Sequence, residues 1–144
     1  MSGHFEILDG FPADVLAVSA HGRIGRESYE KTLMPAIDEA VAREGKVKLF
    51  YLLGEDYDGF TVGAAMDDAR LGLFHLHDFA RIAVVTDVDW IRGAAHLFGP
   101  LLEAPVHAFP LSEMDAAKTW IMENSPPERF SKVAADRIVP TPRS

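Results

Sequence analysis

Two hydrophobic periods alternate along the chain. Short apolar runs bounded by glycine, proline or acidic residues predict β-strands. Segments in which apolar residues recur every three or four positions predict amphipathic helices. The predicted strands cover residues 5–8, 15–21, 47–53, 82–85 and 105–109, and the predicted helices cover residues 29–45, 61–77, 89–102 and 112–122.

This order of elements, β-β-α-β-α-β-α-β-α, predicts an α/β fold. The first two strands are close enough to pair as a hairpin. The later strands alternate with helices, which favours right-handed crossovers and a five-stranded, mostly parallel sheet with about four helices. The strands Val47–Leu53 and Ile82–Val85 are apolar on both faces and suit the centre of the sheet. Because Pro126 and Pro127 break the pattern, we expect one domain over residues 1–123 and an irregular tail over residues 124–144.

Composition narrows the class of protein. The 144 residues are 48% hydrophobic and 25% charged, which is typical of a globular domain. The absence of cysteine excludes disulfides, thiolate metal sites and cysteine nucleophiles. Neither a signal peptide nor a run of about 20 apolar residues is visible, so the expected location is the cytoplasm.

Charge is unevenly distributed along the chain. Four basic and two acidic side chains give residues 124–144 a charge of +2, and the total of −8 leaves −10 for residues 1–123. An acidic body repels phosphate groups, which argues against a nucleic-acid partner and against flat docking on anionic lipid. Only local contacts from the tail or from an apolar patch remain for a membrane surface.

Motifs for catalysis and cofactor binding are missing. The sequence contains no G-x-G-x-x-G, no phosphate-binding P-loop and no G-x-S-x-G, and Gly22–Gly25 reads as a tight turn. His75 and His77 are two residues apart, so on a helix they point to opposite sides, and Asp67 lies two turns from His75. We therefore predict no metal, no cofactor and no enzymatic activity.

One edge of the predicted sheet is a candidate site. The segment Gly54–Phe60 is expected to be a loop at the carboxyl end of a central strand, where open parallel sheets bind ligands. It carries the aromatic residues Tyr57 and Phe60 among acidic residues, and Thr61 follows as a helix N-cap. A phosphate on Thr61 would face free backbone N–H groups, although a cap alone also explains it. Trp90 and Phe98 are candidates for the wall of an apolar pocket at this edge, and core packing is the alternative.

The sequence pattern around several of these residues also resembles that of a known family. The matching positions are His21-Gly-Arg-Ile24, the helix start Asp58-Gly-Phe-Thr61, Asp67-Asp68, His75, Phe79, Arg81-Ile-Ala-Val-Val85 and Trp90. Together they resemble the SpoIIAA-like branch of the STAS fold over about residues 3–122. The resemblance implies a STAS-type fold with the element order given above.

The resemblance also carries functional implications. In the anti-sigma antagonists of the STAS fold, a serine in a "DSSG" motif at the start of the second helix is phosphorylated to switch partner binding. Here Phe60-Thr61-Val62-Gly63 occupies that place, so Thr61 is the candidate phosphorylation site. The SpoIIAA-like branch is also similar to CRAL-TRIO lipid carriers, which implies an apolar pocket and transient membrane association.

Two functions follow as hypotheses. The first is a non-catalytic interaction module that binds a protein partner, or a second copy as a homodimer, through the edge at residues 57–62. The alternative is a carrier or sensor of a small apolar ligand held near Phe74, Trp90 and Phe98, with peripheral membrane contact.

Overall fold

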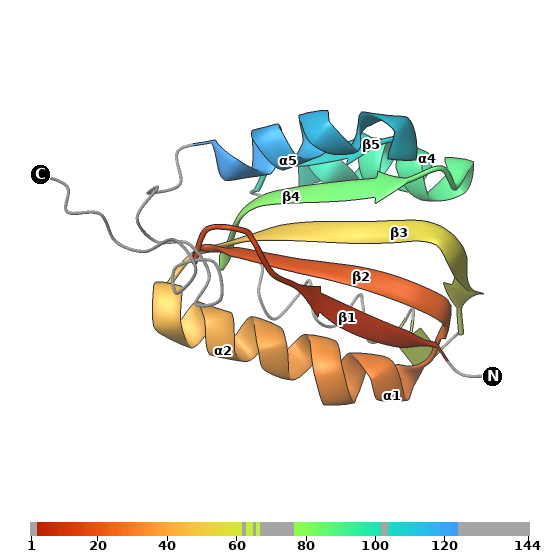
Figure 1. Ribbon diagram of the computed structural model, residues 1–144, viewed down its shortest axis with the longest axis horizontal. Helices are drawn as coiled ribbons and strands as arrows, with labels where there is room; N and C mark the ends of the chain where they lie inside the picture. Colours follow the sequence, from red (N-terminus) through yellow and green to blue (C-terminus); the bar gives the residue numbers. More distant parts are fainter. Residues whose placement is uncertain (1–2, 62, 65, 67–76, 102–103, 124–144) are drawn as a thin grey trace, which may run out of the picture.

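Five strands form one sheet in the order β1-β2-β3-β4-β5 (Figure 1). The computed structural model describes residues 3–61, 63–64, 66, 77–101 and 104–123. The strands are β1 (His4–Leu8), β2 (Val15–Ile24), β3 (Val47–Phe60), β4 (Phe79–Thr86) and β5 (Val106–Phe109). The helices are α1 (Arg26–Ser28), α2 (Met34–Glu44), α4 (Asp89–Phe98) and α5 (Met114–Met122). β1 is antiparallel to β2 and the other pairs are parallel, which confirms the predicted fold class.

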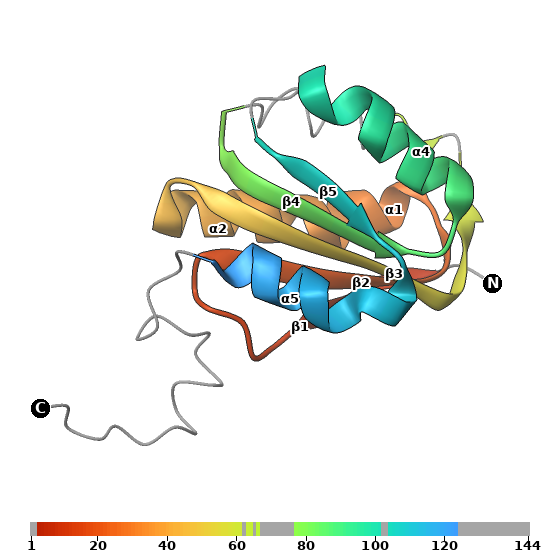
Figure 2. The same cartoon turned by 90° about the horizontal axis from the view of Figure 1, so that it is seen from above.

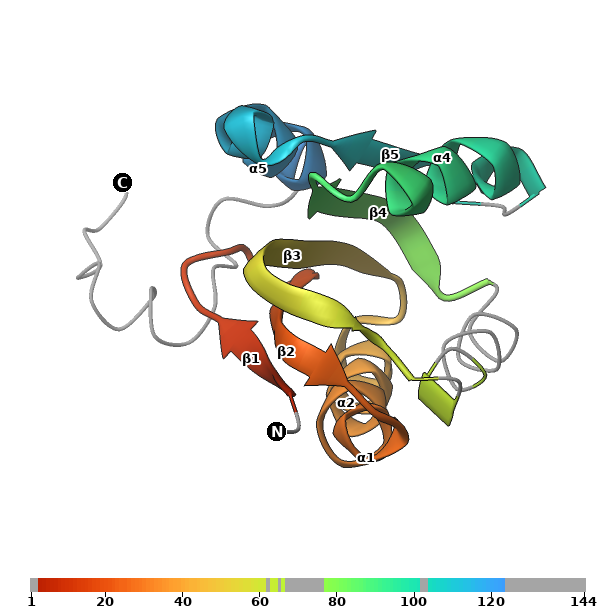
Figure 3. The same cartoon turned by 90° about the vertical axis from the view of Figure 1, so that its right-hand side faces the viewer.

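The sheet separates two apolar cores. Helices α1 and α2 cover one face and α5 covers the other, as Figure 3 shows. β3 contributes to both cores, because Leu49, Tyr51 and Leu53 face the α2 side while Phe50 and Leu52 face α5. Figure 2 shows α4 beside β5 at the end of the sheet, and its Ile91 joins the core on the α2 side. The central position predicted for residues 47–53 is confirmed by their burial, in which Leu52 alone is half-buried, whereas Ile82 and Val84 in β4 are both half-buried.

The first helix is continuous from Arg26 to Glu44 but contains one π-helical turn, Tyr29–Leu33. Pro35 follows this turn and has no N–H to donate to the carbonyl of Lys31. Widening the helix before the proline relieves the clash that its ring would otherwise make with that carbonyl. The wide turn places Tyr29 and Leu33 in the core, where both are fully buried and the Tyr29 hydroxyl lies 3.0 Å from that of Tyr51.

Two cations attach the end of α5 to the sheet. Lys48 donates a hydrogen bond to the carbonyl of Glu123, and Arg81 donates one to the carbonyl of Trp120 at 2.6 Å. Positive charge at a helix C-terminus is stabilising because the last carbonyls lack helical partners. Burial lowers the pKa of Lys48, and the carboxylate of Asp14 at 3.9 Å opposes that effect.

The structure corrects the prediction of a loop over residues 54–60. β3 continues through this segment to Phe60 and pairs with the end of β2, with Gly22 opposite Tyr57 and Ile24 opposite Phe60. The pairing passes through two shifts of register, and Gly22 and Gly59 have positive φ values of 70° and 110°. Glycine tolerates this conformation, so the strands bend without ending.

Other element boundaries differ less. Of the helix predicted for residues 61–77, only Gly63, Ala64 and Met66 are described as helical. α4 ends at Phe98 and passes into a short 3-10 turn rather than continuing to residue 102. α5 begins at Met114 rather than at residue 112, because residues 111–113 form a 3-10 turn, whose Leu111 N–H donates to Asp87 at 2.9 Å. The predicted tail at 124–144 lies outside the described residues.

Phe50→Ala tests the central role of β3. Phe50 is fully buried and packs against Phe11, with ring centroids 5.0 Å apart. Removing a buried aromatic ring leaves a cavity, so we expect the free energy of unfolding to fall by about 3–5 kcal/mol. Chemical denaturation measures the loss. The exposed Lys46→Ala variant is the control, and equal stability of the two variants would contradict the assignment.

Candidate functional site

Tyr57 and Phe60 pack against the protein instead of projecting into solvent. Both rings are half-buried, they meet edge-on at 5.3 Å, and Phe60 lies 6.1 Å from the buried ring of Tyr29. Both rings therefore contribute to packing at this end of the sheet, and a binding role for them stays a prediction. The bulges at Gly22 and Gly59 make this packing possible, because they bend the ends of β2 and β3 while keeping the strands paired.

Thr61 ends β3 and begins the next helical segment. Its backbone N–H donates to the carbonyl of Ile24 at 2.9 Å, and its Oγ1 accepts a hydrogen bond from the Ala64 N–H at 3.1 Å. This is the geometry of an N-cap, so the predicted capping role is confirmed. Phosphorylation of Thr61 stays a prediction.

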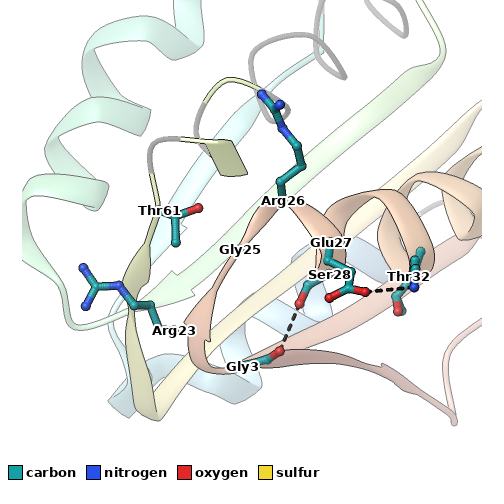
Figure 4. Close-up of a pocket in the computed structure, with 9 residues that line it drawn as sticks. Gly3, Arg23, Gly25, Arg26, Glu27, Ser28, Thr32 and Thr61 are labelled. Atoms are coloured by element: carbon teal, nitrogen blue, oxygen red, sulfur yellow. Dashed lines mark hydrogen bonds and ion pairs between the residues drawn. The ribbon is translucent and has the colours of Figure 1, made fainter. Parts of the chain in front are cut away.

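A cleft of about 500 Å³ lies beside Thr61, where β2 leads into α1 (Figure 4). Thr61 faces Gly25, and a side chain added at Gly25 would come within 3.9 Å of the Thr61 methyl group. Figure 4 shows Thr61 between the side chains of Arg23 and Arg26. The residues that line the cleft are Gly3, Arg23, Gly25, Arg26, Glu27, Ser28, Lys31, Thr32 and Thr61.

Most polar groups of this cleft already serve the fold. Ser28 donates to the carbonyl of Gly3 at 3.0 Å. Lys31 pairs with Glu27 at 2.8 Å, and Arg26 approaches Glu30 at 3.7 Å. The exposed Arg23 adds a further positive charge on an otherwise acidic protein. The lining is therefore polar, and it suits a polar group better than an apolar ligand.

A second feature is the outer face of α4. Trp90 is 66% exposed and Leu97 is 69% exposed, although both are large apolar residues. They are seven residues apart and so lie on the same side of the helix, two turns from each other. Gly93 lies between them with open space above its Cα. We call these three residues, Trp90, Gly93 and Leu97, the α4 stripe.

The α4 stripe borders a groove of about 640 Å³ between α4 and β5. β5 is the last strand of the sheet, so one of its edges faces away from β4. Arg92 and His96 line the groove from α4, and Val106 and His107 line it from β5. Arg92 donates to Asp89 at 2.6 Å, and His107 stacks on Trp120 at 4.5 Å. The groove is thus lined by both apolar and polar groups from each element, with Leu97, Val106 and Ala108 beside Arg92, His96 and His107.

Comparison with known proteins now identifies the family. The sequence model of the SpoIIAA-like family matches residues 15–122, three quarters of the chain. The chain belongs to the SpoIIAA-like family. A solved structure of an uncharacterized protein from Shewanella loihica PV-4, a DUF3478 family member with a SpoIIAA-like fold, has a TM-score of 0.67 to this chain. The two are 24% identical, and the match covers 83% of this chain and 94% of that one. No curated protein gives a significant match.

The SpoIIAA-like fold does not gather all the predicted site residues in one place. Tyr57, Phe60 and Thr61 lie together at the ends of β2 and β3, whereas Trp90 points into solvent and does not line the α4–β5 groove. Trp90 is therefore not packed in the core, and its place in the wall of an apolar pocket stays a prediction. Phe98 ends α4, and Phe74 lies outside the described residues.

Sequence reasoning missed two features of this SpoIIAA-like chain. Leu97 was overlooked, although its spacing of seven residues from Trp90 was a visible signal. The second feature is His21, whose Nδ1 lies 2.7 Å from Asp56 and whose Nε2 lies 3.1 Å from Glu6. His4 stacks on its ring at 5.0 Å. Only the protonated imidazole can donate to both carboxylates, so His21 ties β1, β2 and β3 together as a cation.

No membrane-spanning helix is found in the part of the chain that the structure describes. Likewise, no three histidine or carboxylate side chains in the described ranges converge on a common metal position. The carboxylates of Glu6 and Asp56 approach opposite nitrogens of the His21 ring, which keeps them apart.

Tyr57→Ser combined with Phe60→Ser distinguishes packing from binding at the β2–β3 end. Because both rings are half-buried against Tyr29, we expect the free energy of unfolding to fall by about 2–4 kcal/mol. Thermal and chemical unfolding measure it, with the exposed Asp58→Ser as control. An unchanged stability together with lost self-association or ligand retention would restore the binding role that the sequence suggested.

The His21 bridge predicts a pH-dependent stability. Hydrogen bonding to Asp56, its charge, and the bond and charge of Glu6 raise the pKa of His21 above 6.5, and partial burial opposes this. A raised pKa in the folded state means that the bridge contributes fully below pH 6.5 and that its contribution is lost as the pH rises through the folded pKa. We expect unfolding free energies measured across this range to decline with pH. His21→Gln, which cannot ionise, should remove that part of the decline, and identical pH profiles would refute the bridge.

Proposed function

We propose that this SpoIIAA-like chain is a non-catalytic interaction module that binds a protein partner through the α4 stripe and its groove. The observation that carries the proposal is the exposure of Trp90 and Leu97 on one side of α4. Four large apolar residues in the described part of the chain are exposed, and the other two, Ile7 and Met66, belong to different elements. Scattered exposed residues are ordinary, but two on one helix face next to a groove are typical of an interaction surface.

The surroundings of the α4 stripe also support this proposal. Tryptophan dominates binding energy at many interfaces, because a large rigid ring loses little conformational freedom on contact. Asp89, Arg92 and His96 border the stripe with polar groups, and this resembles the polar rim of a protein interface. Gly93 leaves a notch in which a partner side chain or backbone fits close to α4.

The cleft beside Thr61 favours a non-catalytic role. Two of its three hydroxyls, those of Ser28 and Thr61, take part in hydrogen bonds that hold the chain before β1 and the helical segment after Thr61; the third belongs to Thr32. The described lining contains no histidine to serve as a general base for any of the three. The alternative, a carrier of a small apolar ligand with membrane contact, needs an apolar cavity. The residues around the cleft beside Thr61 are largely polar, and half of those around the α4–β5 groove are polar.

Site-specific photo-crosslinking in cells tests the proposal. A photoreactive amino acid replaces Leu97 in the α4 stripe and, as the matched control, the exposed Ala42 on α2. We expect irradiation to give a discrete protein adduct from position 97 and none from position 42, with mass spectrometry identifying the captured chain.

Absence of an adduct at position 97, or equal adducts at both positions, would overturn the proposal. Native mass spectrometry of freshly purified protein completes the experiment. A bound small apolar molecule together with no adduct at position 97 would establish the carrier function in its place.

A further inference from the structure

The α4 stripe has a self-complementary order of side chains. Along the helix, the large residues Trp90 and Leu97 lie on either side of a notch at Gly93. The half-buried Ala94 lies next to this notch. A second copy of the helix laid antiparallel, with a twofold axis between positions 93 and 94, brings Trp90 opposite Leu97 of the other copy. Gly93 then lies nearest to Gly93 of the other copy, with one residue's rise between them. Large residues therefore meet at both ends, and small residues meet in the middle where the backbones approach.

Charge is complementary in the same arrangement. Asp89 lies in the first turn of α4 and His96 in the last, both exposed and both on the side of the stripe that Gly93 occupies. A twofold axis perpendicular to the two helices keeps each flank on its own side, so Asp89 of one copy comes within about two residues' rise of His96 of the other. The Asp89 carboxylate, which accepts a hydrogen bond from Arg92 of its own chain through Oδ1 at 2.6 Å, accepts a second one from the imidazole on each side of the axis. The antiparallel helix dipoles add to this attraction.

We infer that the partner of the α4 stripe is a second copy of this chain, bound with the two α4 helices antiparallel around Gly93. This inference rests on the proposed function and names its partner. A ten-residue helix is about 15 Å long, so the contact is smaller than the roughly 1,200 Å² of a standard stable interface. We therefore expect a reversible dimer whose population depends on concentration.

A single cysteine at the twofold axis tests the arrangement directly, because the chain has no cysteine of its own. Helices packed 8–10 Å apart bring the two copies of position 93 to a Cα separation of about 4–6 Å, which a disulfide can span. A Cβ at position 93 meets no atom within 4 Å in its own chain. We expect Gly93→Cys to form a covalent dimer under mild oxidation and Ala42→Cys, exposed on α2, to remain largely monomeric.

Sedimentation velocity of the cysteine-free protein provides the second measurement. We expect dimerisation of the wild-type chain as its concentration rises, and Leu97→Glu should weaken it at least tenfold while the melting temperature is retained. Equal crosslinking of Gly93→Cys and Ala42→Cys, or a wild-type chain that stays monomeric, overturns the inference.

The identity of the protein captured at position 97 in cells distinguishes failure of the dimer from failure of the proposed function. Capture of a different protein by a monomeric chain leaves the proposed function standing and refutes the dimer. Capture of this same chain supports both, and no adduct from a monomeric chain refutes both.

Discussion

Burial of β3 on both faces is the constraint on which the rest of the structure depends. Its side chains alternate between two cores, so α1 and α2 on one face and α5 on the other are all positioned against the same strand. Tyr51 joins the first core through its hydroxyl contact with Tyr29, and Phe50 joins the second through Phe11. Lys48, two residues before Phe50, reaches the carbonyl of Glu123 just after α5. One strand thus contacts both layers of helices, and its pairing positions β2 on one side and β4 on the other.

The same strand determines the shape of the carboxyl edge. Beyond Leu53, β3 no longer pairs with β4. It continues as a bent two-stranded ribbon with β2, through the bulges at Gly22 and Gly59. This ribbon brings Thr61 against Gly25 and turns Tyr57 and Phe60 back onto the core. The protonated His21 bridges the ribbon to β1. The edge that parallel sheets commonly use for ligands is here occupied largely by the protein's own contacts.

The far end of the sheet is less completely covered. Among the described strands, β5 is short and pairs on one side only, and α4 rests on it with Ile91 inward and the α4 stripe outward. Because burial of Trp90 and Leu97 is favourable, covering them is the gain that the proposed association provides. The proposed surface thus lies away from the carboxyl edge, which the protein's own contacts largely occupy.

The sequence by itself determined the order of the elements, the parallel α/β class and the family, because hydrophobic period and local motifs are properties of neighbouring residues. It also determined that Thr61 caps a helix, since a cap needs only the next three residues. Only the tertiary structure decided that residues 54–60 are a strand, because its pairing with β2 depends on bulges more than 30 residues apart. The inward turn of Tyr57 and Phe60, the double bridge of His21 and the outward stripe on α4 were likewise decided by packing. Each depends on which face of an element meets the rest of the molecule, and a single period along the chain does not encode that choice.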